Sequence, residues 1–266
     1  AIIALYLFSL TNAKAQILAW EFNGAAGNET TIASTTTDAN LNGSSVSRGA
    51  GINPAPLGNA FSSNDFTVSG TFTDAVNNNE YLQFAVNAKS GYQVSLSTLD
   101  VNFRRSSTGP NTFQWQYSLD GFATSGINIG TAISYTTSPT NGTAQTQIDL
   151  SAISALQNVT NTTTITLRLY GYGASQLTGT FAFGRLTGND LAIGGTVTSS
   201  GGPSLTVGTL SNQFGNVCTG TTTNYETFTV SGSNLDGSSV DVGTLSGFSY
   251  CLTPNGTYTS TLNLPY

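Results

Sequence analysis

The segment VNFRRSSTGPNTFQWQYSLDGF (101–122) contains the side chains that point most directly to ligand binding. Arg104 and Arg105 stand next to each other there, although the whole chain has only seven Lys and Arg residues. Further along, aromatic and amide side chains alternate: Phe113, Trp115 and Tyr117 against Gln114 and Gln116. Guanidinium and amide groups form directional hydrogen bonds, and aromatic rings offer an apolar plane. Such a set suits the recognition of sugar hydroxyls.

Strand geometry decides which of these side chains can reach a ligand. Successive side chains of a strand point to opposite faces of a sheet, and clustered aromatic rings are typical of a core. We therefore expect Trp115 to be buried and the opposite face to bind the ligand. The residues expected on binding faces are Arg104, Gln114, Gln116, Arg168 and Tyr170. An alternative stays open, in which the arginines only organise hairpins by pairing with Asp100, Asp120 and Asp190.

A cation site is a further candidate. Glu21 and Asn23 lie at the first predicted strand, and Asp190 precedes the last strand of the first predicted module. Calcium prefers hard oxygen ligands, so these residues would hold a structural calcium ion if the two strands meet at one edge of a sandwich. No loop matches a calcium-binding motif. Ordinary turns stabilised by Asn and Asp side chains are the alternative.

The composition argues against two classes of function. The net charge is −6 and only 8% of the residues are charged, so the chain cannot neutralise a run of phosphates and we expect no nucleic-acid binding. The chain has no histidine, which removes the commonest general base and zinc ligand. No nucleophile elbow, P-loop, HExxH or GxGxxG motif occurs either. We therefore expect these residues not to form an enzyme.

The strands that must position the candidate residues appear as alternating apolar and polar patterns. They fall at 17–22, 81–86, 98–103, 164–172, 180–184 and 191–197. The abundant Thr favours strands, and Asn, Ser and Gly favour turns. Only SAISALQNV (151–159) has helical spacing, and we expect one or two turns there. The pattern predicts an all-β protein, an antiparallel β-sandwich of the jelly-roll type.

Composition changes divide the chain into four expected parts. These are a signal peptide at 1–15, the jelly-roll module at 16–198, a linker at 199–203 and a partial Ig-like β-sandwich at 204–266. An apolar run that ends in Ala13-Lys14-Ala15 is typical of a secretory signal with its cleavage site, and it is too short to span a membrane. We expect the signal peptide to lack its beginning. The Ig-like part is shorter than the roughly 100 residues typical of such a sandwich, so we expect it to be truncated at its C-terminal end.

The two cysteines of the chain, Cys218 and Cys251, both fall in the Ig-like part. An even number of cysteines in an exported protein is compatible with one disulfide, which is the pairing we expect. In the alternative, they are two small buried apolar residues that never meet.

Several segments resemble a module of secreted bacterial proteins that carry a sorting signal for type IX export or a similar surface anchor. They are QILAWEFNG (16–24), the stretch from 91 to 122 and ITLRLYGYGAS (165–175). The stretches 214–235 and 242–266 are similar to the Ig-like repeat of the same proteins. The resemblance implies a secreted or cell-surface location and a fold similar to that of carbohydrate-binding jelly rolls. Fold similarity alone does not imply binding.

Together these observations favour a non-catalytic secreted or cell-surface module that binds a polysaccharide or a cell-surface glycan, or mediates adhesion. The alternative is a structural spacer of a larger secreted hydrolase, a nuclease or a glycosidase, whose catalytic domain would lie beyond Tyr266. We expect no membrane span and no cofactor other than a structural calcium ion.

Overall fold

The computed structural model of the chain forms two compact units, of which the first ends at Ser200 and the second begins at Gly201. This division falls inside the predicted linker at 199–203. The structure describes residues 15–201, 204–216, 218, 220–233, 235, 239–254 and 256–265. The predicted signal peptide therefore lies outside the described residues except for Ala15.

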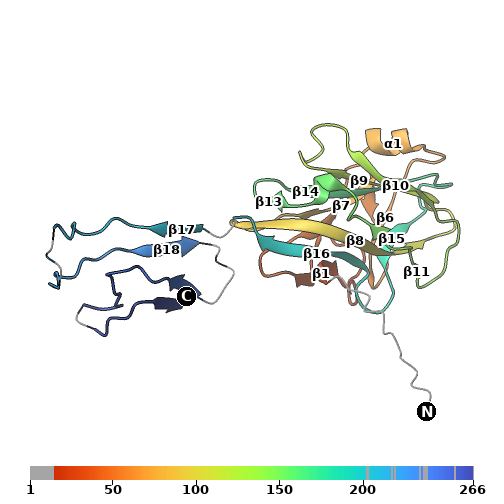
Figure 1. Cartoon of the computed structure of the whole chain (residues 1–266). Coiled ribbons are helices and arrows are strands. Elements are labelled where there is room, and N and C mark those ends of the chain that lie inside the picture. The colour runs from red at the N-terminus through yellow and green to blue at the C-terminus, as the bar shows by residue number, and fades with distance from the viewer. Residues whose placement is uncertain are drawn as a thin grey trace, which may run out of the picture. The chain divides into compact units, whose positions relative to one another are not determined.

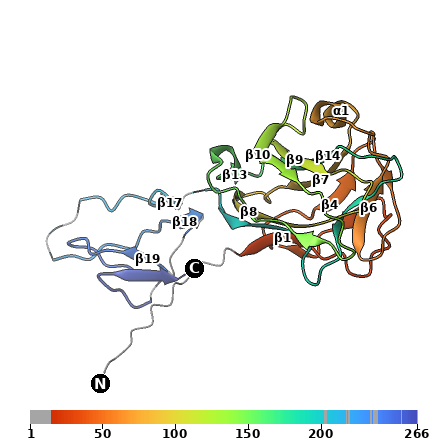
Figure 2. The same ribbon diagram turned by 90° about the vertical axis from the view of Figure 1, so that its right-hand side faces the viewer.

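Two antiparallel sheets pack face to face in the first unit (Figures 1 and 2). The ten strands of the large sheet are β1 (Gln16–Trp20), β3 (Thr36–Thr37), β5 (Asn53–Pro54), β6 (Ala60–Asn64), β8 (Tyr92–Arg105), β11 (Thr143–Ala144), β12 (Ile148–Asp149), β13 (Val159–Thr160), β15 (Phe181–Gly184) and β16 (Leu191–Ser199). Their order is β3-β1-β16-β8-β15-β6-β5, and the three short strands β11, β12 and β13 also pair with β8. The long strand β8 is therefore the centre of this sheet.

The small sheet has six strands, β2 (Ile32–Ala33), β4 (Ser45–Arg48), β7 (Tyr81–Val86), β9 (Thr112–Ser118), β10 (Ile127–Ser134) and β14 (Ile165–Tyr172). Their order is β10-β9-β14-β7-β4-β2. The chain changes sheet at most connections, as in β7 to β8 to β9, which is the kind of crossing that a jelly roll requires. The prediction of an all-β, antiparallel sandwich is confirmed.

Among the residues that the structure describes, helical structure is confined to short segments. The predicted helix at 151–159 is the single 3₁₀ turn η1 (Ser154–Leu156), because the chain enters β13 at Val159. The helix α1 (Phe72–Asn77) was not predicted. It starts at a capping box, in which Thr71 and Asp74 each accept a backbone N–H of the other. Within the described ranges, no helix is long and apolar enough to cross a bilayer.

Aromatic rings fill the space between the two sheets. Phe103 on β8 meets Phe113 on β9 with ring centroids 4.9 Å apart, and Phe113 meets Phe181 on β15 at 4.2 Å. Trp115 on β9 lies parallel to Phe183 on β15, with an interplanar angle of 8° and 6.0 Å between centroids. Trp115 is only 1% exposed, so its predicted burial is confirmed. The aromatic face of β9 is core, and its amide face must point outward.

The second unit contains two separate two-stranded antiparallel ladders. These are β17 (Ser204–Val207) with β18 (Val230–Ser233), and β19 (Ser239–Val242) with β20 (Leu262–Pro265). Among the described residues of this unit, every side chain is at least partly exposed. The unit has the strands expected of a partial sandwich, and its Ig-like assignment stays a prediction.

The cysteines differ from the expected pairing. Cys218 is an exposed free thiol, and Cys251 is a half-buried free thiol. The Cys251 thiol donates instead to the carbonyl oxygen of Thr253 at 2.9 Å, a bond made within its own turn. The structure therefore does not contain the disulfide between Cys218 and Cys251.

Removing one ring of the aromatic core should destabilise the first unit strongly. Phe183→Ala deletes a fully buried ring between Trp115 and Phe103, and we expect a loss of about 3–5 kcal/mol in the free energy of unfolding. Urea denaturation followed by tryptophan fluorescence measures it, because both tryptophans of the chain are buried in this core. The control Leu177→Ala, at a side chain that is 53% exposed, should change stability by less than about 0.5 kcal/mol. Equal losses for the two variants would contradict this assignment of the core.

Candidate functional site

A row of polar side chains crosses the outer face of the small sheet. Arg168 on β14 is paired in register with Gln83 on β7 and with Gln116 on β9, and Gln116 is paired with Asn128 on β10. Hydrogen bonds follow the same row. The Nε of Arg168 donates to Oε1 of Gln83 at 2.9 Å, and Nε2 of Gln116 donates to Oδ1 of Asn128 at 2.9 Å. The fold therefore joins two predicted site residues, Gln116 and Arg168.

The guanidinium of Arg168 is held between two aromatic rings. Its central carbon lies 3.9 Å from the ring centroid of Tyr81 and 3.9 Å from that of Phe122. A cation over an aromatic face gains about 0.5–1 kcal/mol at an exposed site, and about 2 kcal/mol or more when it is desolvated. Two such contacts, together with the bond to Gln83, fix the plane of the guanidinium.

The loop at 118–126 carries Phe122 to this position. Its conformation depends on Asp120, whose Oδ1 accepts the hydroxyl of Ser118 at 2.6 Å and whose Oδ2 accepts the hydroxyl of Thr124 at 2.6 Å. These two hydroxyl donors lower the pKa of Asp120 from its ordinary value of 3.8 to about 2. Phe122 itself has a φ of 65°, a left-handed conformation that is uncommon for a residue with a side chain. The hydrogen bonds of Asp120 therefore give the loop a defined conformation, which positions the ring of Phe122.

Gly126 lets the loop close against the sheet. A Cβ atom at this position would lie 2.4 Å from the ring of Phe122 and 2.6 Å from Oε1 of Gln116. Both distances are shorter than any normal contact, so a side chain here would push the ring or the amide away. The glycine allows both groups to stay at the site.

Helix α1 forms the opposite wall. Phe72 packs edge-on against Tyr170 with centroids 5.7 Å apart and also contacts Tyr172 at 6.0 Å. Tyr170 is only 1% exposed beneath it, and burial raises the pKa of its phenol. Tyr170 was expected on an open face, but α1 covers it. An outward-facing residue on an inner strand such as β14 is still buried when another element packs on it.

Between these walls lies a hollow of about 450 Å³, which we call the α1 hollow. Its lining residues are Phe72, Thr73, Val76, Asn79, Gln116, Phe122, Thr124, Ser125, Gly126, Arg168 and Tyr170. Figure 1 shows α1 above the small sheet, next to β9 and β10. Three of the predicted ligand-binding residues, Gln116, Arg168 and Tyr170, therefore lie in one hollow.

Gln114 has a structural role instead. Its side chain is only 5% exposed. The amide Nε2 donates to the carbonyl oxygen of Ile129 at 3.2 Å and to that of Trp115 at 2.8 Å. The pairing of β9 with β10 is irregular between Ile129 and Ile133, and the Gln114 amide donates to the Ile129 carbonyl at the start of this irregularity. Gln114 does not line the α1 hollow described above, and its contact with a ligand stays a prediction.

Arg104 lies on the other layer of the sandwich. It belongs to β8 of the large sheet, so it cannot share a surface with Gln116 and Arg168 on the outer face of the small sheet. Its Nη1 donates to the hydroxyl of Thr180 at 2.9 Å. Burial lowers the pKa of Arg104, and the nearby charge of Arg185 lowers it further. The alternation in the sequence correctly predicted that Arg104 points outward. It could not show that the outer face of the large sheet and that of the small sheet lie on opposite sides of the sandwich.

Arg105, its neighbour, fastens a loop. The side chain is 5% exposed. Its Nε donates to the carbonyl oxygen of Pro110 at 2.8 Å and its Nη1 to that of Thr136 at 3.0 Å. Its Nη2 donates to the carbonyl oxygens of Ser107 at 3.0 Å and Gly109 at 2.7 Å. These bonds hold the turn between β8 and β9, and they leave Arg105 no role toward a ligand.

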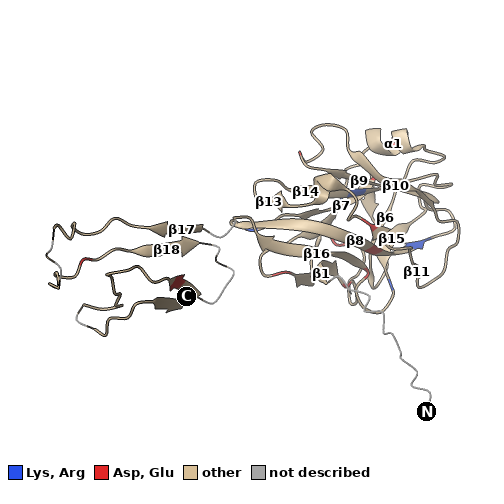
Figure 3. Ribbon diagram, in the orientation of Figure 1, with Lys and Arg blue, Asp and Glu red and all other residues tan. Residues whose placement is uncertain are grey.

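The alternative interpretation required these arginines to pair with aspartates, and they do not. In the part of the chain that the structure describes, the hydrogen bonds of Arg104, Arg105, Arg168 and Arg185 end on hydroxyl, carbonyl and amide oxygens. Charged residues are few and scattered over the strands (Figure 3). Carboxylates such as Asp120 accept from hydroxyl and backbone N–H groups instead.

Asp190 is a buried carboxylate at the sandwich edge where the calcium site was predicted. It is 1% exposed, and its Oδ1 accepts from the Asn102 amide at 3.0 Å and from the Leu186 N–H at 3.1 Å. Its Oδ2 accepts from the Phe22 N–H at 3.2 Å. Burial raises the pKa of Asp190, and the charge of Glu21 acts in the same direction. The proximity of Glu21 to Asp190 agrees with the expected meeting of the two strands.

The calcium site itself stays a prediction. Oε1 of Glu21 accepts the backbone N–H of Asn23 at 3.2 Å, which is an ordinary turn contact. Three N–H donors already occupy three of the roughly four acceptor positions of the Asp190 carboxylate, so a cation there would share the carboxylate with them. Among the described residues, no group of three or more His, Cys, Asp or Glu side chains could hold a metal ion.

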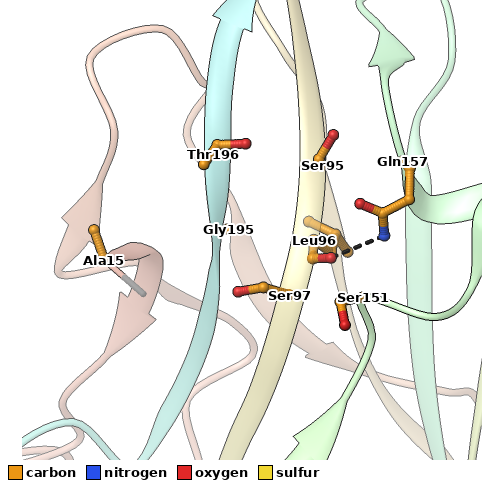
Figure 4. A pocket seen from close by; sticks show the side chains of 8 residues that line it. All are labelled: Ala15, Ser95, Leu96, Ser97, Ser151, Gln157, Gly195 and Thr196. Atoms are coloured by element: carbon orange, nitrogen blue, oxygen red, sulfur yellow. Dashed lines mark hydrogen bonds between the residues drawn. The ribbon is translucent and has the colours of Figure 1, made fainter. Parts of the chain in front are cut away.

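Another hollow, of about 380 Å³, lies on the large sheet (Figure 4). It is lined by Ala15, Ser95, Leu96, Ser97, Ser151, Gln157, Gly195 and Thr196. The amide of Gln157 is already engaged with the carbonyl oxygen of Leu96 at 2.9 Å. The lining offers hydroxyl groups without a charged group or an aromatic ring, so it has little to orient a ligand with. The α1 hollow is the better candidate.

Most residues at the α1 hollow were not predicted, among them Phe72 and Phe122, nor was Gln83, the partner of Arg168. The alternation in YLQFAV (81–86) already places Gln83 opposite the core residues Leu82 and Phe84, so this pattern would have identified it. Phe72 and Phe122 come from a short helix and a loop, which have no periodicity. Folding alone brings their rings to the sheet.

Comparisons with models of known protein families and with curated proteins give no match for this chain. The geometry of the site is therefore the basis for assigning a function.

Removing the buried carboxylate should destabilise the first unit. Asp190→Ala leaves the N–H groups of Phe22 and Leu186 and the amide of Asn102 without an acceptor. Unsatisfied buried donors cost about 1–3 kcal/mol each, so we expect a loss of about 3 kcal/mol or more in urea denaturation. The control Asp100→Ala, on β8, removes the acceptor of an exposed hydrogen bond from the Gln147 amide and should cost less than about 1 kcal/mol. A loss no greater than that of the control would contradict a structural role for Asp190.

The loop at 118–126 should keep its carboxylate ionised to low pH. The pKa of Asp120 is about 2 in the folded chain against an ordinary value of 3.8. A lowered carboxyl pKa means that the stabilising contribution is complete above 3.8 and is lost as the pH falls toward 2. NMR titration of the side-chain carboxyl carbon should show a midpoint near 2 in the unmodified chain. Ser118→Ala removes the first donor and should raise the midpoint; an unchanged midpoint would show that the hydroxyl is not responsible.

Proposed function

We propose that the first unit is a non-catalytic carbohydrate-binding module and that the α1 hollow is its ligand site. The observation that carries this proposal is the guanidinium of Arg168, held between Tyr81 and Phe122 at the side of a hollow that also contains amide and hydroxyl groups. A polysaccharide or a cell-surface glycan is the proposed ligand, and adhesion is the proposed consequence of binding.

The lining of the hollow suits a sugar. Gln116, Thr124 and Ser125 offer amide and hydroxyl groups that can donate and accept hydrogen bonds. Phe72 and Phe122 are half-buried, so part of each ring remains available as an apolar surface for stacking. The volume of about 450 Å³ falls within the range of roughly 300–1,000 Å³ that ligand sites occupy. A single sugar unit with its immediate neighbours would fit such a space.

The chemistry of the lining supports binding rather than catalysis. The side chains of the hollow include no carboxylate, thiol or imidazole group. Hydrolysis of a glycoside by the usual mechanism requires two carboxyl groups across the scissile bond. The lining of the α1 hollow thus supports binding without catalysis, and neither nucleic acid nor a membrane is a proposed partner.

The segments that resemble secreted bacterial surface proteins support a secreted or cell-surface location for this module. Within the same proposal, the second unit is an Ig-like spacer, and a structural calcium ion at Glu21, Asn23 and Asp190 remains a prediction.

A purely structural function is the second candidate. The observation that favours it is that these polar groups already have partners in the protein: Arg168 donates to Gln83, and Gln116 donates to Asn128. In that case the unit would be a spacer of a larger secreted hydrolase.

Affinity electrophoresis of the full chain in native gels that contain soluble neutral or acidic polysaccharides distinguishes the two candidates. We expect retardation by at least one polymer, and we expect Phe122→Ala to weaken it by up to about tenfold, because an aromatic contact contributes about 0.5–1.5 kcal/mol beyond the area that it buries. Each gel is run with calcium and with a chelator, which also tests the predicted calcium site.

The matched control is Phe228→Ala, which removes a ring that is 38% exposed in the second unit. It should leave retardation unchanged. Tryptophan fluorescence verifies that each variant keeps the folded core. No retardation by any polymer would overturn the binding proposal and favour the spacer.

A further inference from the structure

The hydrogen-bonding capacity of Arg168 is not exhausted by the protein. A guanidinium has five N–H donors. The bond from Nε to Gln83 at 2.9 Å and the bond from Nη1 to the Tyr170 hydroxyl at 3.4 Å use two of them. The three remaining donors are on the two Nη nitrogens. Arg105, in contrast, donates through all three of its nitrogens to carbonyl oxygens.

All partners of Arg168 are neutral. They are the Gln83 amide, the Tyr170 hydroxyl and the rings of Tyr81 and Phe122. The nearest loop and helix each carry a carboxylate, Asp120 and Asp74, and both accept hydrogen bonds within their own element. Burial disfavours an unpaired charge. Arg105 also lacks a carboxylate partner, but carbonyl oxygens accept from all three of its nitrogens, whereas Arg168 is half-buried and keeps free donors.

The geometry also limits how a ligand can approach this cation. The rings of Tyr81 and Phe122 each lie over the guanidinium with 3.9 Å between its carbon and the ring centroid. Gln83 occupies the Nε side. The end that carries the Nη nitrogens has the free donors, and a carboxylate binds to such an end through two parallel N–H···O bonds.

We infer that the α1 hollow selects acidic sugars and that Arg168 binds the carboxylate of a uronic acid unit. This inference rests on the proposed carbohydrate-binding function and adds the class of sugar. The hydroxyl groups of Thr124 and Ser125 and the amide of Gln116 would contact the sugar hydroxyls. One arginine in a chain with a net charge of −6 cannot attract polyanions by charge alone. Selection therefore depends on the fitted carboxylate.

The test compares each acidic polymer with its own carboxyl-reduced form. Polygalacturonate, alginate and hyaluronate are used in affinity electrophoresis of the full chain, each beside the same polymer after reduction of its carboxylates to alcohols. We expect the acidic form of at least one polymer to bind about tenfold more tightly than its reduced form, since a hydrogen-bonded charge pair contributes about 1.5–3 kcal/mol. Dextran sulfate measures retention by negative charge without a carboxylate.

Variants at position 168 identify the group responsible. Arg168→Gln should lower the affinity for the acidic polymer to that for its reduced form. Arg168→Lys keeps the charge but has no planar fork, so it should recover only part of the difference. Lys89→Gln removes one positive charge from an exposed residue outside the hollow and should change nothing. Tryptophan fluorescence again verifies folding of each variant.

The outcomes separate this inference from the function on which it rests. If the reduced or neutral polymers bind as tightly as the acidic ones, the chain binds glycans and the selection for uronic acid is wrong. If dextran sulfate binds as well as the acidic polymers, binding is by charge alone and the selection is also wrong. If no polymer of either kind binds, both proposals are wrong.

Discussion

The parallel contact between Trp115 and Phe183 joins the two sheets, and the rest of the first unit depends on the aromatic core around it. These rings come from β9 and β15, and Phe103 on β8 adds the centre of the large sheet. Burying a large aromatic side chain contributes about 1.5–3 kcal/mol. Because alternate residues of a strand face opposite ways, burying Trp115 also forces Gln116 outward. The core thereby determines the surface.

The register of the strands then determines which outward-facing side chains lie next to one another and form a site. Antiparallel pairing places Gln83, Arg168 and Gln116 side by side on three neighbouring strands. A shift of one residue in either ladder would send Arg168 into the core face. The aromatic core and the register of the ladders thus act together, since both determine which side chains of each strand face inward and which face outward. What surrounds the row is contributed by segments without such periodicity, the helix α1 and the loop at 118–126.

The scarcity of charge explains how the loops are held. Arg48 is a second example beside Arg105: its guanidinium donates to backbone carbonyl oxygens, including those of Gly27 and Ser62. Burial lowers the pKa of Arg48 to about 10, so it remains a cation at neutral pH. Buried carboxylates such as Asp190 accept N–H groups in the same manner. In this chain, charged side chains such as these form hydrogen bonds with backbone groups of the loops. Arg168 differs, because it lines the α1 hollow and keeps free donors there.

By itself the sequence determined the all-β class, the antiparallel sandwich, the burial of Trp115 and the outward direction of Arg104, Gln116 and Arg168. Each of these follows from local alternation, which strand geometry imposes on any half-buried strand. Tertiary structure alone decided which outward residues share a surface. It separated Arg104 from Arg168, because they belong to different sheets. It buried Tyr170 under α1 and brought Phe122 onto Arg168. These contacts join residues far apart in the chain, and no local pattern encodes their distance in space.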